Sequence, residues 1–334
     1  MATQRNNVVD ILRFVAVTWV VLFHLNETVP YQNNWYRLLV KHGHLGVPIF
    51  FVISGYCIAL SVNHKSNVKE FISRRFFRIF PTYWFSLLIV MLAVLSSLTL
   101  IGTNSVAKLP KTIVEISATI TLLTSPFSKV STINWVYWSL TVEIFFYAII
   151  AIYLFINQKF RFSLLLLVTI LPFFFKDQDH GLLFFVKYWP SFMLGFSFYF
   201  LLIQQNSKNI FLTVLSLITL IFFSNEANNY IFTCVFTVGI ISLGHINPIN
   251  KNSFSNMGNY SYAIYLIHVP IGVNILGAVK QFSFVQHNIW ANILWDLICY
   301  ALVILIARII YLKLELPLIK YGKRKFEPQK LKPI

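Results

Sequence analysis

The chain has 334 residues, of which 57% are hydrophobic and only 11% are charged. Because soluble domains carry about 25% charged residues, this composition excludes an ordinary water-soluble protein and indicates a multi-pass membrane protein. The formal net charge of +16 favours contact with anionic membrane lipids over nucleic acid, since the basic residues flank apolar segments.

About ten apolar segments are predicted to form membrane helices, because a helix needs about 20 apolar residues to cross a bilayer. In chain order they lie near residues 8–25, 44–62, 80–101, 134–156, 162–175, 182–203, 210–223, 230–246, 260–280 and 290–312. The fifth and seventh segments are short for a full span. The predicted fold is therefore an all-α bundle of about ten transmembrane helices.

The distribution of lysine and arginine predicts the orientation of this bundle. With the N-terminus inside, inner segments hold seventeen of these residues and outer segments hold eight. The positive-inside rule then places both termini in the cytoplasm. We expect one membrane domain over residues 1–319, followed by a loose basic tail over residues 320–334. The outer connection over residues 102–133 contains KTIVEISATITLLT, which is predicted to lie along the membrane surface as an amphipathic helix.

The first apolar segment carries two ionisable residues, Arg13 and His24. Their separation of eleven residues places them on one helix face, about 16 Å apart along the axis. Asp10 precedes Arg13 by three residues and can pair with it. Charged residues inside a membrane are costly and usually mark functional sites. The alternative is that Asp10 and Arg13 anchor the inner interface and His24 meets outer water.

The segment ISRRFFRIFP, residues 72–81, places Arg75 and Arg78 three residues apart on one helix face. Guanidinium groups suit phosphate, which they bind through paired hydrogen bonds. These arginines are therefore candidates to bind a phosphate-bearing ligand on the cytoplasmic side. The alternative is that they only reflect the positive-inside rule.

Glu143 lies in NWVYWSLTVEIFFY, residues 134–147, deeper than Trp135 and Trp138, which are typical of an outer aromatic belt. A carboxylate at that depth needs a partner. We expect Arg13 or His24 to be that partner, with Arg13 preferred, either for chemistry or as a purely structural link between helices.

His268 lies in NYSYAIYLIHVPI, residues 259–271, and we expect a neutral histidine that is hydrogen-bonded between helices rather than one that acts directly in chemistry. The three cysteines have no metal-ligand or CxxC spacing. Neither a metal site nor a disulfide is predicted.

Together these stretches resemble acyltransferase family 3, membrane-bound O-acyltransferases that modify bacterial surface carbohydrates. The resemblance rests on six motifs in order from Asp10 to Pro317. They are DILRFVAVTWVVLFH at 10–24, GHLGVPIFFVISGYCIAL at 43–60, RRFFRIFPTYW at 74–84, WSLTVEIFFY at 138–147, SYAIYLIH at 261–268 and ELP at 315–317. Phe14 and Ile144 depart from the residues that are frequent in that family.

The resemblance implies a stand-alone O-acyltransferase of the bacterial cytoplasmic membrane. The implied donor is acyl-CoA, with acetyl-CoA as the default and a succinyl group as an alternative, and no metal is implied. The implied acceptor is a hydroxyl of a surface polysaccharide or lipid-linked glycan. The implied catalytic residues are His24, Arg13 and Glu143, and the donor-binding residues are Arg75 and Arg78. The supporting residues are Asp10, Ser54, Trp138, Ser139 and His268.

Two other classes of protein stay open from the residues alone. A secondary transporter of a carbohydrate or an acyl intermediate would also bury charges at mid-membrane. It would usually show inverted repeats and helices broken by Gly or Pro in matching halves, which this sequence does not show. A non-catalytic receptor or assembly factor would not need the chemistry of His24.

Overall fold

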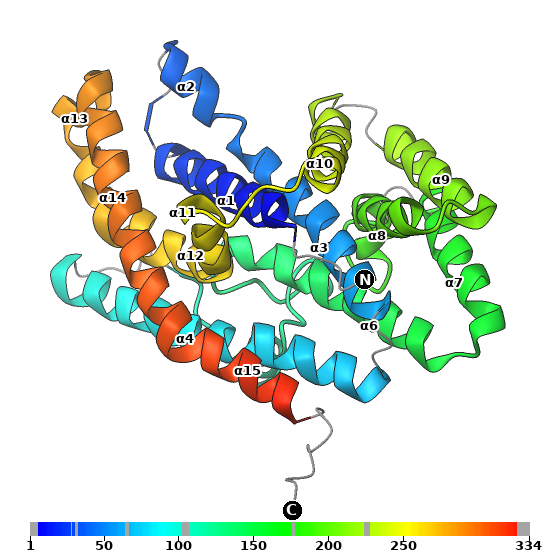
Figure 1. Cartoon of the computed structure of the whole chain (residues 1–334). Helices are drawn as coiled ribbons and strands as arrows, with labels where there is room; N and C mark the ends of the chain where they lie inside the picture. Colours follow the sequence, from blue (N-terminus) through cyan, green and yellow to red (C-terminus); the bar gives the residue numbers. More distant parts are fainter. Residues whose placement is uncertain are drawn as a thin grey trace, which may run out of the picture.

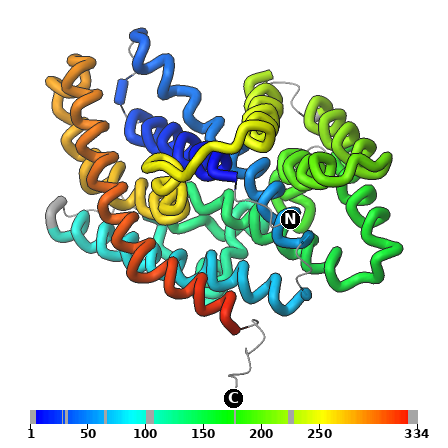
Figure 2. Tube along the Cα trace, viewed as in Figure 1, coloured from blue at the N-terminus to red at the C-terminus, as the bar shows by residue number. Residues whose placement is uncertain are grey.

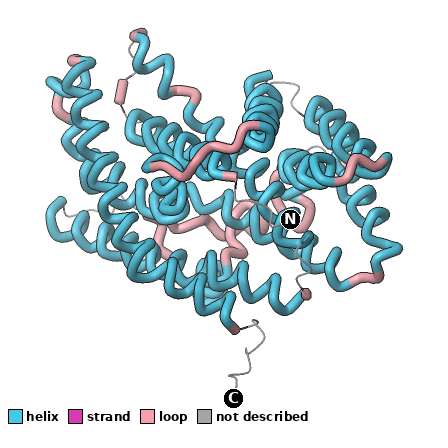
Figure 3. The backbone as a smooth tube through the Cα atoms, viewed as in Figure 1, coloured by secondary structure: helices cyan, strands magenta, loops and turns pink. Residues whose placement is uncertain are grey.

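The computed structural model describes residues 6–27, 29–30, 33–63, 67–101, 107–175, 178–223 and 228–325. These residues form helices joined by loops, and no strand occurs among them (Figures 1 and 3). The all-α prediction is confirmed. The helices are α1 (Asn7–Glu27), α2 (Trp35–Val40), α3 (Gly46–Asn63), α4 (Val68–Ile101), α5 (Ile113–Thr121), α6 (Trp138–Phe155), α7 (Gln158–Ile170), α8 (Trp189–Ile203), α9 (Ser207–Phe223), α10 (Asn228–Ile246), α11 (Ser253–Met257), α12 (Ser261–Ile267), α13 (Ser283–His287), α14 (Ile289–Ile310) and α15 (Leu316–Arg324).

Shorter elements link several of these helices. Single turns of 3-10 helix occur at Gly43–Leu45 and Gly258–Tyr260, among other places. Two π-helical segments, His268–Ile275 and Tyr311–Glu315, extend α12 and α14. π-Helical turns are rare and occur frequently at functional sites.

Seven helical stretches of the described residues are long and apolar enough to cross a membrane. They are Asn7–Glu27, Trp35–Asn63, Val68–Thr99, Trp135–Phe155, Asn228–Ile246, Ser253–Gln281 and Ile289–Arg324. The predicted count of ten is not confirmed, because α7, α8 and α9 have only 13, 15 and 17 residues. At 1.5 Å per residue they are about 20–26 Å long, which is less than the 30 Å hydrocarbon core.

Helix α1 occupies the middle of the assembly and contacts α3, α10, α11, α12 and α14 (Figure 2). Glycines let neighbouring backbones come close to it. A Cβ atom on Gly258 would lie 2.0 Å from the carbonyl oxygen of Asp10, and one on Gly43 would lie 2.1 Å from that of Trp19. This close approach brings the chain before α12 against the first turn of α1, where Asp10 lies.

Helix α4 is 34 residues long, which corresponds to about 51 Å. A helix of that length either tilts in a bilayer or extends beyond its core. Helix α15 packs along it, and α6 and the first π-helical segment also contact it (Figure 1). The first turns of α4, with Arg75 and Arg78, therefore face the end of the last membrane helix.

Helices α3 and α8 make the most extensive contact in the structure. Gly55 and Gly195 sit at their crossing, where small residues let membrane helices approach closely. A Cβ atom would lie 2.0 Å from the carbonyl oxygen of Phe192 at Gly55, and 1.9 Å from that of Val52 at Gly195. The two backbones are thus packed with no room for a methyl group.

Gly55→Ala is expected to push α3 and α8 apart and to lower the free energy of unfolding by about 1–3 kcal/mol or more, the usual cost of overpacking. Thermal unfolding of the detergent-solubilised protein measures this loss. Gly239→Ala is the matched control, because a Cβ atom there meets nothing within 4 Å. Equal melting temperatures for the two variants would contradict the packing argument.

The connection over residues 102–133, which was predicted to be outer, contains the predicted helix as α5. Thr112 and Glu115 form a capping box at its start, with the Glu115 amide donating to Thr112 Oγ1 at 3.2 Å. Ile113 and Val114 are strongly exposed, as expected for a helix that meets lipid. Its placement along the membrane surface stays a prediction, and residues 102–106 lie outside the described residues.

Thr112→Ala is expected to loosen the first turn of α5, since loss of a threonine N-cap costs about 1 kcal/mol. The amides of Lys111 and Thr112 donate to Glu115 Oε2 at 2.6 and 3.2 Å. They hold the pKa of that carboxyl below its ordinary value of 4.5. The capping box should therefore stabilise the first turn of α5 fully at pH values above 4.5, the ordinary pKa of the carboxyl. This stabilisation should be lost as the pH falls through the lowered pKa of Glu115. Amide hydrogen exchange in α5 would measure both effects, and exchange independent of both changes would contradict them.

The predicted tail begins as helix rather than loose chain. Residues 320–324 continue α15, and Gly322 packs against Phe77 of α4. Contact with α4 explains why this basic segment is helical. Residues 326–334 of the predicted tail lie outside the described residues.

Candidate active-site cavity

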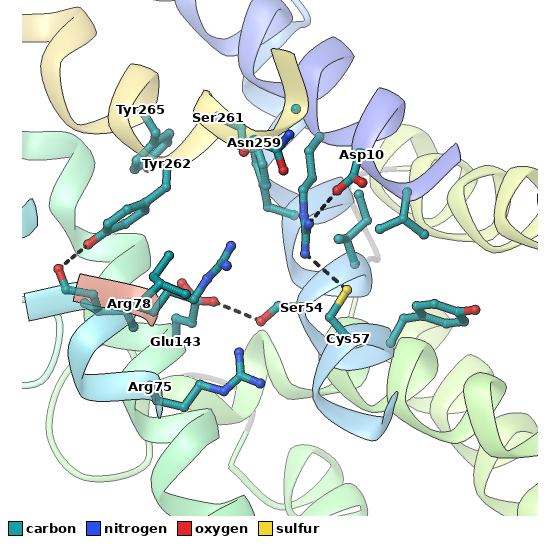
Figure 4. A pocket seen from close by; sticks show the side chains of 18 of the residues that line it. Asp10, Ser54, Cys57, Arg75, Arg78, Glu143, Asn259, Ser261, Tyr262 and Tyr265 are labelled. Carbon is teal, nitrogen blue, oxygen red and sulfur yellow. Dashed lines mark hydrogen bonds and ion pairs between the residues drawn. The ribbon is translucent and has the colours of Figure 1, made fainter. Parts of the chain in front are cut away.

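A cavity of about 600 Å³ lies between α1, α3, α4, α6, α12 and α15 (Figure 4). It brings together residues from most of the motifs singled out in the sequence. Its polar and ionisable lining consists of Asn6, Asp10, Arg13, Ser54, Tyr56, Cys57, Ser61, Arg74, Arg75, Arg78, Ser139, Glu143, Tyr147, Asn259, Ser261, Tyr262, Tyr265, Tyr311, Glu315 and Lys323.

Arg13 and Asp10 form the predicted pair on α1. The Arg13 Nη1 atom lies 2.9 Å from Asp10 Oδ1, and its Nη2 atom lies 3.1 Å from Cys57 Sγ on α3. One turn of helix brings residues three apart together, which explains why the pair was predictable. The pair holds the Arg13 guanidinium on the α1 wall of the cavity.

Arg75 and Arg78 both line the cavity from α4, so the prediction that they share a helix face is confirmed. The Arg75 guanidinium lies over the rings of Tyr147 and Phe71, 5.4 and 5.5 Å from their centroids. Neighbouring Arg74 instead forms an ion pair with Glu70.

No carboxylate of the described residues lies within 4.0 Å of Arg75 or Arg78, although Glu143 and Glu315 are within electrostatic range. The buried Nε atom of Arg75 has no hydrogen-bond partner among the residues that the structure describes. Buried charges are normally paired or bound to a ligand. Two guanidinium groups at one wall therefore suit an anionic ligand.

The prediction that Glu143 pairs with Arg13 or His24 is wrong. Glu143 instead accepts hydrogen bonds from Ser54 Oγ at 2.9 Å and from the Tyr147 hydroxyl. Tyr147 is one helical turn further along α6, and α3 places Ser54 opposite (Figure 4). The carboxylate is thus satisfied by neutral donors, and Arg13 is already bonded to Asp10.

Ser139 and Tyr265 line the end of the cavity that lies towards His268. The Ser139 Oγ and Tyr265 hydroxyl oxygens are 2.7 Å apart, and the Tyr265 hydroxyl also donates to the Val136 carbonyl at 2.7 Å. The ring centroids of Tyr265 and His268 are 5.6 Å apart. These contacts join α6 to α12 at this end of the cavity.

His24, Trp138 and His268 do not line this cavity. His24 lies further along α1, with its Nδ1 atom 3.0 Å from Glu27 Oε2. Its ring centroid is 5.3 Å from that of His268 and 6.2 Å from that of Trp135. Trp138 packs against the rings of Phe51 and Tyr188 instead, so the structure gives it a packing position.

His268 differs from its prediction, because its hydrogen bond stays within its own helix. The Nδ1 atom lies 2.7 Å from the Tyr265 carbonyl oxygen. The ring itself is fully buried and meets His24, which belongs to a different helix.

A second cavity, of about 490 Å³, lies beside the end of α1 that carries His24. Phe23, Asn26, Glu27, Val29, Pro30, Arg37, Val40 and Lys41 line it. Phe23 and Glu27 also contact the His24 imidazole. Glu27 was not singled out in the sequence, although its position three residues after His24 is a signal that could have found it.

A buried polar network adjoins this second cavity, and the sequence did not reveal it. Arg37 and Lys280 were counted as outer loop charges, yet their exposed fractions are only 7% and 2%. Lys280 forms an ion pair with Asp296. Asp296 also accepts from Asn26 at 2.7 Å and from Tyr36 at 2.5 Å. Asp296 lies 270 residues from Asn26 and 260 residues from Tyr36 along the chain, so no local sequence pattern predicts these contacts.

Among the residues searched, no group of three or more His, Cys, Asp or Glu side chains could hold a metal ion. Cys57, Cys234 and Cys299 are all free thiols. Glu315, in the ELP motif, contributes a buried carboxylate to the cavity wall. An acidic residue at the end of a long apolar segment is the signal that marks it.

Comparisons with known proteins agree with these observations. A family model described as an acyltransferase domain matches residues 6–312. An O-acetyl transferase of Shigella phage Sf6 is 24% identical over 290 residues, covering 80% of this chain and 85% of the relative. The peptidoglycan O-acetyltransferase OatA of Listeria monocytogenes is 34% identical over 90 residues, covering 25% of this chain and only 13% of that relative. No solved structure gives a significant match.

The family match spans nearly the whole chain and includes every motif except the final ELP. The apolar helices agree with a multi-pass membrane protein. The chain therefore belongs to the acyltransferase 3 family and is an enzyme that transfers acyl groups.

Proposed function

We propose that the protein is an O-acetyltransferase of the bacterial inner membrane. It takes an acyl group, acetyl by default, from acyl-CoA on the cytoplasmic side. It transfers this group to a hydroxyl of a surface polysaccharide or lipid-linked glycan on the outer side. The observation that carries the proposal is the cavity wall with Arg75 and Arg78, neither of which has a carboxylate of the described residues within ion-pair distance. The names of the two relatives support O-acetyl transfer.

The donor fits the cavity by charge and by shape. The phosphates of coenzyme A would bind Arg75 and Arg78 through charge-assisted hydrogen bonds, which are stronger than neutral ones. Lys323 lines the same cavity from α15 and adds positive charge. The thin pantetheine arm would then extend past Glu143 towards Ser139 and Tyr265, which would bring its thioester beside Tyr265, whose ring contacts that of His268.

The acceptor fits the other end of α1. A carboxylate can only accept a hydrogen bond, so the contact with Glu27 places a proton on Nδ1 of His24 and a lone pair on Nε2. Sugar hydroxyls are poor nucleophiles at neutral pH. A neutral imidazole held in this tautomer would take the hydroxyl proton as the oxygen attacks the acyl carbon, which typically accelerates such reactions about 10²–10⁴-fold.

Labelled acyl transfer in isolated membranes tests the proposal. Membranes from a strain that expresses the protein and from a deletion strain are supplied with acetyl-labelled acetyl-CoA. We expect base-labile label in the glycan fraction only where the protein is present, and a matching mass loss in the glycan of the deletion strain. Label that crosses the membrane without covalent attachment would favour a transporter instead and would overturn the proposal.

A further inference from the structure

His268 is the first residue of the π-helical segment His268–Ile275. Its two ring nitrogens differ in their hydrogen bonding. Its Nδ1 atom lies 2.7 Å from the Tyr265 carbonyl oxygen. A carbonyl oxygen can only accept, so Nδ1 bears the proton and Nε2 bears the lone pair. That Nε2 atom is buried and has no hydrogen-bond partner among the described residues.

An unsatisfied polar atom in a buried position is rare and calls for a functional explanation. His268 has no exposed surface, so bulk solvent does not reach Nε2. An imidazole nitrogen with a free lone pair is a nucleophile as well as a base. The hydrogen bond to Tyr265 fixes the tautomer of His268 and therefore leaves the lone pair on Nε2, in a position that bulk solvent does not reach.

His268 lies between residues that line the two cavities. Tyr265, which lines the first cavity, is in ring contact with His268. Phe23 and Glu27, which line the second cavity, are in contact with His24. The His24 and His268 rings are themselves 5.3 Å apart. The two imidazoles thus connect the lining of one cavity with the lining of the other.

We propose that His268 is the nucleophile that carries the acyl group between the two cavities, and that His24 serves as the base for the second step. This inference rests on the proposed function. In the first step Nε2 of His268 attacks the thioester carbonyl. A nitrogen–carbon bond forms, the carbon–sulfur bond breaks, and coenzyme A leaves as its thiolate. The acyl-imidazolium keeps the proton on its Nδ1 atom, which donates a hydrogen bond to the Tyr265 carbonyl oxygen.

In the second step His24 takes the proton of the acceptor hydroxyl, and the oxygen attacks the acyl carbon. An oxygen–carbon bond forms, the nitrogen–carbon bond breaks, and His268 returns to its neutral form. The proton on His24 is released and balances the thiolate, which becomes the free thiol. Burial of His268 protects the acyl-imidazolium from hydrolysis, which is a general benefit of a closed site.

The two-step reaction needs two histidines, one to carry the acyl group and one to act as the base. An imidazole that holds the acyl group on Nε2 has no lone pair left to deprotonate the acceptor. Separate rings allow the donor to react from the first cavity and the acceptor to react from the second. The acyl group then passes from the first cavity to the second as a covalent adduct of His268.

The experiment traps the adduct by removing the second step. His24→Gln protein, purified in detergent, is mixed with acetyl-CoA, and its intact mass is measured after removal of free coenzyme A. We expect a mass gain of one acetyl group, which peptide mapping places on His268 and neutral hydroxylamine removes. The double variant His24→Gln/His268→Asn should show no gain.

Asparagine is the informative replacement, because its amide nitrogen can take the place of Nδ1 and donate to the Tyr265 carbonyl. It removes only Nε2, so a purely structural role of His268 would survive the change. His24→Gln/His245→Asn is the matched control, since His245 is exposed at the end of α10, and it should keep the mass gain.

Three results would overturn the inference. One is an acetyl adduct that persists in the double variant with His268→Asn. The second is no adduct in His24→Gln when the wild-type protein transfers acetyl groups. The third is full acyl-transfer activity of the single His268→Asn variant. A wild-type protein that never consumes acetyl-CoA would overturn the proposed function as well, and this outcome is distinct from the other three.

Discussion

His24→Ala is expected to lower acyl transfer by about 10²–10⁴-fold, the usual contribution of a positioned general base. The imidazole lies at the end of α1, where Glu27 fixes its tautomer at 3.0 Å and His268 lies beside it. The variant should still insert into the membrane and fold, because the contacts that hold α1 involve Gly43, Gly258 and the apolar core.

The measurement compares O-acetyl content of the glycan with the amount of protein in the membrane. Donor binding should stay near the wild-type level, since Arg75 and Arg78 lie in the first cavity. His245→Ala controls for the loss of a histidine in general, because that side chain is exposed and lines neither cavity. Acylation at the wild-type level by His24→Ala would refute the role of His24.

Arg75→Ala is expected to raise the acyl-CoA concentration at half-maximal rate by about 10- to 100-fold. A charge-assisted hydrogen bond contributes about 1.5–3 kcal/mol, and each 1.4 kcal/mol corresponds to a factor of ten in affinity. The maximal rate should change much less, because Arg75 lines the first cavity from α4, whereas His24 does not line that cavity. Arg78→Ala should behave in the same way.

Arg75→Lys distinguishes charge from geometry. An ammonium group keeps the charge but cannot form the paired hydrogen bonds of a guanidinium, so only part of the affinity should return. Arg308→Ala is the matched control, since this arginine is exposed on α14 and does not line the cavity. A rate that depends on donor concentration in the same way in Arg75→Ala and wild type would exclude the phosphate contact.

The remaining catalytic assignments follow from the corrected partner of Glu143. Because Ser54 and Tyr147 donate to this carboxylate, its negative charge is held at the cavity wall between α3 and α6. It lies within electrostatic range of Arg75 and Arg78. We therefore expect Glu143 to act on the electric field around Arg75 and Arg78, the proposed donor-binding residues, rather than to orient His24.

Several features of this protein were determined by its sequence alone. Composition required a membrane environment, because a chain with 11% charged residues cannot cover a soluble surface. Helical periodicity predicted the pair of Asp10 with Arg13 and the shared face of Arg75 and Arg78, both of which the structure confirms. These features depend on neighbours within one or two helical turns, and helix geometry fixes such neighbours locally.

Only the tertiary structure decided which helix faces meet. Glu143 bonds to Ser54, 89 residues away, and Lys280 and Arg37 are buried where sequence patterns placed them in loops. His24 meets His268 because α12 and the π-helical segment that follows it both pack against α1. The direction in which a helix turns its faces depends on close packing against several partners at once. A pattern along a single segment carries no information about that packing.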